Sequence, residues 1–152
     1  MGCSPAWLDC HSNSKTWDLL VTKSDVWITF DLLRQRDPGS LTSDERLVLA
    51  FGEIRTEVNH GGFDSYLRYP SRQNAPIAVV AARVADCPAF ADLIDEAIAL
   101  VGRDVLDGDD EVLYRRLEEL EADLRDLDQR FYELENTADL DTAQGQLLAR
   151  LP

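Results

Sequence analysis

The chain has 152 residues, of which 45% are hydrophobic, and its 29 acidic and 15 basic residues give a net charge of −14. This length suits one domain with a substantial buried core, which argues against a disordered chain. The excess of carboxylates argues against direct binding to nucleic acid or to an anionic membrane, because both require Lys and Arg to neutralise phosphate.

The first predicted elements are a loose leader over residues 1–14 and two helices. Helical spacing of apolar residues predicts a helix over residues 24–36. Its expected buried face is formed by Val26, Trp27, Phe30 and Leu33. Thr42, followed three residues later by Glu45, forms a capping box that predicts the start of a second helix. That helix is predicted to end at residues 59–62, where a glycine can adopt the left-handed conformation, and one or two further turns follow.

Two prolines mark the helices in the middle of the chain. Pro76 fits the first turn of a helix. The expected buried face of this helix is Ile77, Val80, Ala81 and Val84. Cys87-Pro88 ends this helix and begins the next one, which is predicted to run to about Gly102. Its apolar residues are Phe90, Leu93, Ile94, Ala97, Ile98 and Val101.

The longest predicted helix follows Gly108 and carries an uninterrupted apolar stripe. Its members recur at alternating steps of four and three: Leu113, Leu117, Leu120, Leu124, Leu127, Phe131 and Leu134. The stripe is either one side of a coiled-coil dimer or part of the domain's own core, and a compact chain favours the core. With a short helix over about 141–150, residues 15–152 are predicted to form an all-α single domain of six to seven helices.

The negative charge is concentrated in the second half of the chain. Residues 86–141 contain 19 acidic residues and 5 Arg, whereas residues 1–85 contain 10 acidic and 9 basic residues. Because self-repulsion on this scale opposes compaction, we interpret the acidic half as a surface for a basic partner; the alternative is solubility alone. The carboxylates assigned to this face are Asp110, Glu111, Glu118, Glu119, Glu121, Asp123, Asp126, Asp128 and Glu133.

The spacing of these carboxylates is compatible with that of DNA phosphates. Carboxylates three or four residues apart on a helix are separated by roughly 5–6 Å along its axis. Phosphates of one DNA strand follow at a comparable interval, given ~3.4 Å of axial rise per nucleotide and the helical path of the strand. Four arginines interrupt the face and can form ion pairs within the helix, which favours an ordinary solvated face. They are Arg115, Arg116, Arg125 and Arg130.

No metal site, cofactor or enzymatic activity is predicted. Glu57 and His60 have the Glu-x-x-His spacing of half a di-iron site, but the sequence has no second such motif, so helix capping by Asn59 and His60 is favoured. Residues 107–111 lack the ligand order of an EF-hand. With two histidines and no glycine-rich phosphate loop, the sequence offers no catalytic triad or nucleotide-binding loop.

The cysteines indicate the expected compartment. Cys3, Cys10 and Cys87 are odd in number and irregular in spacing, which does not describe a disulfide framework. Reduced thiols fit a cytoplasmic protein. Residues 1–14 have neither a basic segment nor an apolar segment of a signal peptide, and no apolar run approaches the ~18 residues of a membrane span.

Three segments of the chain resemble the DNA-mimic protein family, in the family's order and within residues 17–134. They are Leu41-Thr42-Ser43-Asp44-Glu45, Glu57-Val58-Asn59-His60-Gly61-Gly62-Phe63 and Leu127-Asp128-Gln129-Arg130-Phe131-Tyr132. His60 and Tyr69-Pro70-Ser71-Arg72 depart from the usual pattern. The resemblance implies a small, acidic, all-helical bacterial domain, often dimeric, that can occupy the DNA-binding surface of a transcriptional regulator.

Glu57, Asn59, Gly61, Gly62 and Phe63 match the family motif, and we interpret them as fold residues that form a helix stop and an aromatic anchor. The sequence therefore predicts a non-enzymatic acidic protein that binds a basic protein surface, with DNA mimicry as the mechanism. An immunity-type inhibitor of a basic toxin, such as a nuclease, is the alternative. An enzyme or a metal-binding helical bundle is the least favoured hypothesis.

Overall fold

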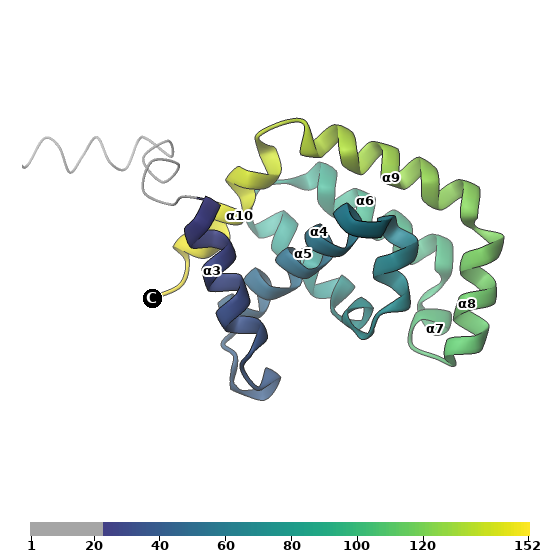
Figure 1. Ribbon diagram of the computed structural model, residues 1–152, viewed down its shortest axis with the longest axis horizontal. Helices are drawn as coiled ribbons and strands as arrows, with labels where there is room; N and C mark the ends of the chain where they lie inside the picture. Colours follow the sequence, from purple (N-terminus) through teal and green to yellow (C-terminus); the bar gives the residue numbers. More distant parts are fainter. Residues whose placement is uncertain (1–22) are drawn as a thin grey trace, which may run out of the picture.

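The computed structural model describes residues 23–152, and all secondary structure in this part of the chain is helical (Figure 1). Two of the elements are short 3-10 helices, and the others are α-helices. In order they are α3 (Lys23–Arg34), η1 (Pro38–Ser40), α4 (Ser43–Arg68), η2 (Pro70–Asn74), α5 (Ala75–Val84), α6 (Pro88–Val101), α7 (Arg103–Leu106), α8 (Asp110–Glu119), α9 (Glu121–Glu135) and α10 (Asp139–Ala149). The predicted all-α fold is confirmed, whereas the predicted leader lies outside the described residues.

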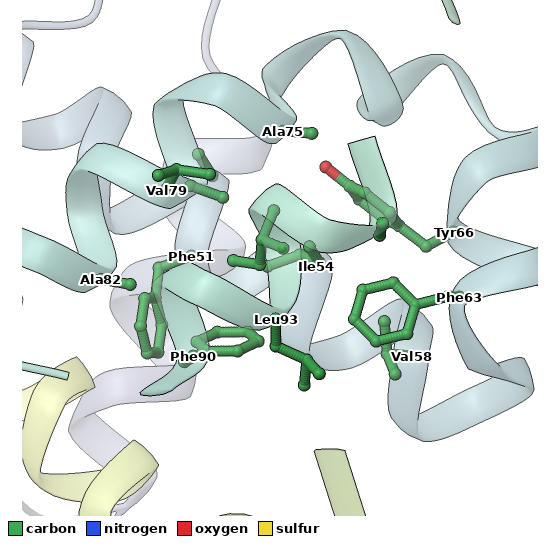
Figure 2. Packing of buried hydrophobic residues seen from close by; sticks show 14 of the residues in the cluster. Phe51, Ile54, Val58, Phe63, Tyr66, Ala75, Val79, Ala82, Phe90 and Leu93 are labelled. Atoms are coloured by element: carbon green, nitrogen blue, oxygen red, sulfur yellow. The ribbon is translucent and has the colours of Figure 1, made fainter. Parts of the chain in front are cut away.

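Helix α4 is the centre of the domain. It contacts α3, α5, α8, α9 and α10, and many of its side chains are part of the hydrophobic core (Figure 2). Phe51 packs edge-on against Phe90 of α6, with ring centroids 5.2 Å apart. On another side of α4, a Cβ at Gly52 would lie 2.4 Å from the ring of Phe30 in α3. The absence of a side chain at Gly52 therefore lets α3 pack closely on α4.

Several predicted helix ends are confirmed because local residues determine them. The side chain of Thr42 accepts a hydrogen bond from the Glu45 N–H, and the Glu45 carboxylate accepts one from the Thr42 N–H, which completes the capping box. Pro76 lies in the first turn of α5 and Pro88 in the first turn of α6. Helix α3 already includes Lys23 and ends at Arg34, two residues before the predicted end.

The predicted buried face of α5 is wrong at Val80 and Val84, whereas Ala81 is buried and Ile77 packs partly against the core. Val80 and Val84 are 51% and 41% exposed, whereas the buried side chains of this helix are mostly alanines. They are Ala75, Ala78, Val79, Ala81 and Ala82. Because α5 packs against both α4 and α6, small side chains at these positions allow close approach, so tertiary packing overrides the larger apolar residues.

The predicted long acidic helix is two helices, α8 and α9, that meet at Leu120. The backbone of Leu120 leaves the helical region, with φ −95° and ψ 10°, and the chain bends there around the core (Figure 1). No Gly or Pro occurs in residues 118–122, so the break carries no sequence signal. Six of the seven apolar stripe residues are buried and Leu134 packs against the core, which confirms the prediction that the stripe belongs to the domain.

The Gly61-Gly62 pair interrupts α4, as predicted, but the helix resumes at once. Gly62 has φ 78° and ψ −178°, a conformation that is essentially restricted to glycine. The kink releases the backbone N–H of Phe63, which donates a hydrogen bond of 2.7 Å to the Asp128 carboxylate of α9. Asp128 therefore caps the second part of α4 from a helix 65 residues away in sequence.

Candidate partner-binding surface

All nine carboxylates assigned to the partner-binding face lie on α8 and α9, at the outer edge of the domain (Figure 1). Helix α9 packs against α4 and α6, and α8 packs against α4, α6 and α7. Because the buried leucines occupy the inner side of both helices, the carboxylates lie on the outer side and on the two flanks. Eight of the nine are exposed: Asp110, Glu111, Glu118, Glu119, Glu121, Asp123, Asp126 and Glu133.

One flank of α9 faces α6 and forms an acidic surface with it. Arg130 of α9 pairs with Glu96 of α6 at 2.8 Å, which fixes this orientation. Helical spacing places three carboxylates of α9 on this flank or on the adjoining outer side, and Asp92 lies one turn before Glu96 on α6, where it pairs with Arg83 of α5 at 3.3 Å. We call Asp92, Glu96, Asp123, Asp126 and Glu133 the α6–α9 acidic surface. Sequence analysis did not select Asp92 and Glu96, although their spacing of four residues was available as a signal.

The opposite flank of α8 and α9 faces the kinked part of α4 and contains a shallow cleft of about 360 Å³. Glu118, Glu121 and Asp64 line it, together with Arg68 and Arg125. Arg68 pairs with Asp64 at 2.8 Å, and Arg125 pairs with Glu121 at 2.6 Å. The expected acidic face is thus divided into two surfaces, and arginines neutralise part of the surface beside α4.

Ion pairs also distinguish the carboxylates on the α6 side. Asp126 lies 3.5 Å from Arg130, and Glu119 lies 3.3 Å from Arg116. Asp123 and Glu133 are exposed and make no ion pair within residues 23–152. These two residues therefore offer the least neutralised charge of the α6–α9 acidic surface to a basic partner.

Two of the expected carboxylates join their own helix to another part of the domain. Asp128 is half-buried and caps the kink in α4, and burial raises its pKa above the ordinary value of 3.8. Asp110 accepts a hydrogen bond of 2.7 Å from the buried guanidinium of Arg72, which also donates to the Leu106 carbonyl. We therefore assign a structural role to Asp128 and Asp110.

The family motif residues position the kink of α4 and the helices around it. Phe63 is fully buried and packs edge-on against Phe131 of α9, with centroids 6.4 Å apart. The Asn59 amide donates to the Arg55 carbonyl one turn earlier and to the Glu135 carboxylate. Glu57 is half-buried and His60 is exposed. These contacts support the interpretation of the motif as a fold element.

A buried charged cluster around Arg55 was missed by the sequence analysis. Arg55 of α4 donates to both oxygens of Glu135 at 2.6 and 2.9 Å, to Asp141 at 2.8 Å and to the Gln144 carbonyl oxygen at 2.6 Å. The cluster ties α4 to the end of α9 and to α10. Its members are 80 to 89 residues apart in sequence, so no local pattern reveals it.

The Arg55 cluster makes stability depend on pH. Burial raises the pKa of Glu135, but hydrogen bonds from Arg55 and Asn59 outweigh it, so the pKa lies below the ordinary 4.5. Glu135 therefore contributes stability that is present above about pH 4.5 and is lost as the pH falls through its depressed pKa. We expect Glu135→Gln to be less stable than the wild type at neutral pH, with a difference that shrinks in acid.

Urea unfolding at about pH 7 and about pH 3 tests this expectation, because the contribution of Glu135 is complete at the higher pH and declines as the pH falls below 4.5. Glu133→Gln is the matched control, since Glu133 is exposed on the same helix and makes no ion pair in the described part of the chain. An equal loss of stability by Glu135→Gln at both pH values would contradict the proposed linkage.

Within the described residues, no group of three or more His, Cys, Asp or Glu side chains is arranged to hold a metal ion. No described helix is both long enough and apolar enough to cross a membrane.

Comparison with protein-family models identifies one family. The model described as "DMP19-like protein" matches residues 39–150, which span α4 to α10 and include the kink, the Arg55 cluster and the α6–α9 acidic surface. No curated protein and no solved structure matches the chain. DMP19 stands for DNA mimic protein 19, so the match indicates DNA mimicry in general, and DNA-mimic families are generally non-enzymatic. The chain belongs to the family of DMP19-like proteins.

Proposed function

We propose that this protein is a DNA mimic whose α6–α9 acidic surface occupies the DNA-binding face of a basic protein, with a transcriptional regulator as the intended partner. The observation that carries the proposal is the row of exposed carboxylates along α9, which adjoins the carboxylates of α6 through the Arg130–Glu96 pair. Membership of the DMP19-like family supports the same class of function.

The spacing of the exposed carboxylates along α9 suits a DNA-binding surface. Along α9, Asp123 and Asp126 are separated by ~4.5 Å of helix axis, and Asp126 and Glu133 by ~10.5 Å. Phosphates of one DNA strand are spaced by ~3.4 Å along the duplex axis, so successive carboxylates correspond to intervals of about one to three nucleotides. A partner surface that places Lys and Arg along a DNA strand can therefore meet several carboxylates at once.

The charge of the surface also predicts how binding responds to salt. Its carboxylates are exposed, so their attraction to a basic partner is screened over about 10 Å at 0.1 M salt and over shorter distances at higher salt. Such charges chiefly accelerate association and select the partner. Binding should weaken steeply as salt increases, and duplex DNA should displace the protein from its partner.

The experiment is capture of partners from a lysate of the source organism at low and high salt, followed by measured affinities with the purified partner. We expect Asp123→Lys combined with Glu133→Lys to weaken binding by at least about tenfold, because each reversed charge opposes a basic surface. Circular dichroism should remain unchanged, since both side chains are exposed.

Asp31→Lys combined with Asp37→Lys is the matched control, because it makes the same change in net charge at exposed positions outside the α6–α9 acidic surface. Retained affinity in this control, with loss in the α9 variant, supports the proposal. Equal losses in both variants would show that binding follows net charge alone. A captured toxin that DNA does not displace would instead favour the immunity-type inhibitor.

A further inference from the structure

The end of the domain formed by α3, η1 and the start of α4 contains a basic cleft in this otherwise acidic protein. The cleft measures about 480 Å³, within the size range of small-molecule sites. Arg34, Arg36 and Arg46 line it, together with a single carboxylate, Glu53. None of these residues belongs to the α6–α9 acidic surface, so the cleft is independent of the proposed function.

Two of the three arginines lack the ion pairs that other arginines make. Among the thirteen arginines of residues 23–152, ten pair with a carboxylate, and only Arg34, Arg46 and Arg103 do not. Arg34 and Arg46 line the same cleft, although the chain has a large excess of carboxylates. Two unpaired guanidiniums at one concave site favour an external anion, since the planar donor fork of Arg matches carboxylate and phosphate oxygens.

The surroundings hold parts of this site in place. Arg36 pairs with Glu45 of the capping box and donates to the Ser40 carbonyl at 3.0 Å, which fixes its guanidinium. The Arg34 guanidinium lies 5.3 Å from the ring centroid of Phe30. On the opposite wall, the Asn74 amide donates to Glu53 at 3.2 Å. Burial raises the pKa of Glu53, whereas the hydrogen bond from Asn74 and the positive charge of Arg34 act in the opposite direction.

An apolar hollow adjoins the basic cleft. It measures about 400 Å³, and Arg46 and Ile77 line both depressions. The other residues that line the hollow are mostly apolar and include Leu47, Pro76 and the exposed side chain of Val80. Leu41 and Leu49 extend the apolar lining on the side of the basic cleft. The combined site thus presents guanidiniums at one end and hydrocarbon at the other.

We propose that this cleft binds a small organic anion, with its phosphate or carboxylate group at Arg34 and Arg46 and its apolar body over Ile77 and Val80. The arginines supply the charge-assisted hydrogen bonds that orient the anionic group. The apolar hollow adds affinity by removing hydrocarbon from water. An anion without an apolar body should therefore bind more weakly than one that carries it.

Isothermal titration with phenyl phosphate, benzoate and inorganic phosphate tests the site. We expect phenyl phosphate or benzoate to bind with a dissociation constant of about 1 mM or lower, and inorganic phosphate to bind several-fold more weakly. The tighter of the two aromatic ligands identifies the preferred oxyanion. Absence of saturable binding by all three probes up to about 10 mM overturns the proposal.

Matched variants locate the binding. Arg34→Gln and Arg46→Gln should each lower the affinity for the aromatic ligands by about fivefold or more. Arg103→Gln removes an arginine without an ion pair that lies outside the cleft, and it should leave the affinity unchanged. Glu53→Gln should strengthen binding, because it removes the only carboxylate that lines the basic cleft. Equal effects of Arg46→Gln and Arg103→Gln would overturn the site.

The apolar end has its own matched pair of valines. Val80→Asn should weaken the binding of phenyl phosphate but leave the binding of inorganic phosphate unchanged. Val112→Asn on α8 should change the affinity for neither ligand. The two valines are 51% and 50% exposed, so neither substitution should unfold the protein. Equal binding of phenyl phosphate by wild type and Val80→Asn would contradict the proposed orientation of the ligand.

Discussion

Arg55→Met is expected to lower the free energy of unfolding by about 3–5 kcal/mol, because it removes one partner of a buried charged cluster. The side chain of Arg55 is 8% exposed, and it donates hydrogen bonds to Glu135, Asp141 and the Gln144 carbonyl oxygen. Methionine fills a similar length but donates no hydrogen bond. The variant therefore leaves Glu135 partly buried without its cation and leaves the buried Gln144 amide without its donor.

Arg125→Met is the control for the Arg55 prediction. Arg125 pairs with Glu121 at 2.6 Å, the same distance as the shortest contact between Arg55 and Glu135, but its side chain is 76% exposed. An exposed pair contributes little, so this variant should change the free energy of unfolding by less than about 1 kcal/mol. Urea denaturation of both variants measures the difference. Equal losses in the free energy of unfolding would contradict the argument that burial determines the contribution of the Arg55 cluster.

A triple variant distinguishes the cost of removing one partner from the net contribution of the cluster to the free energy of unfolding. Arg55→Met combined with Glu135→Leu and Gln144→Leu replaces three of the connected polar groups by apolar groups of similar size and keeps Asp141, whose side chain is 40% exposed. Buried ion pairs replaced in this way often cost little stability, because the desolvation penalty is removed together with the attraction. We expect the triple variant to be more stable than Arg55→Met alone, as measured by the same urea denaturation.

The sequence predicted those features of the fold that depend on neighbouring residues. The capping box at Thr42 and the prolines at the starts of α5 and α6 determine helix ends through contacts within a few residues. The leucine stripe was also correctly assigned to the core, because its spacing defines one side of a helix and a compact chain favours burial of that side within the domain.

Features that depend on distant contacts could not be predicted in the same way. The break at Leu120 follows the curvature of the core and has no helix-breaking residue, and the buried side of α5 depends on its close packing between two helices. The role of a surface carboxylate depends on distant contacts in the same way. Asp128 carries the same charge as Asp126, but only the kink in α4 shows that it caps Phe63 instead of facing a partner.

The Gly62 kink links the family motif to the position of the acidic helix. Asp128 accepts the Phe63 N–H with one oxygen, and Phe63 packs against Phe131 one turn further along α9. The α4 kink and α9 are thus joined by one hydrogen bond and one aromatic contact. Together with the Arg55–Glu135 pair and the Tyr132 hydroxyl, which donates to the Val58 carbonyl at 3.3 Å, this joint positions α9 and the carboxylates of the α6–α9 acidic surface.

Gly62→Ala should lower the free energy of unfolding by about 2–4 kcal/mol, because it imposes both backbone strain and a steric clash. A Cβ at Gly62 would lie 2.4 Å from the Asp128 carboxylate oxygen, and the φ of 78° with ψ of −178° is unfavourable for any residue with a side chain. Relief of the clash requires Asp128 to move away from the Phe63 N–H. Thermal and urea unfolding measure the loss.

Two comparisons decide whether the kink itself causes that loss. Gly145 lies within α10 with nothing within 4 Å of its Cβ position, so Gly145→Ala should stabilise the protein by about 0.5–1 kcal/mol. Asp128→Asn keeps an acceptor for the Phe63 N–H and should be tolerated, whereas Asp128→Ala should cost about 1–3 kcal/mol. If Gly62→Ala were as stable as Gly145→Ala, or if both Asp128 variants behaved alike, the capped kink could not be what holds α9 in place.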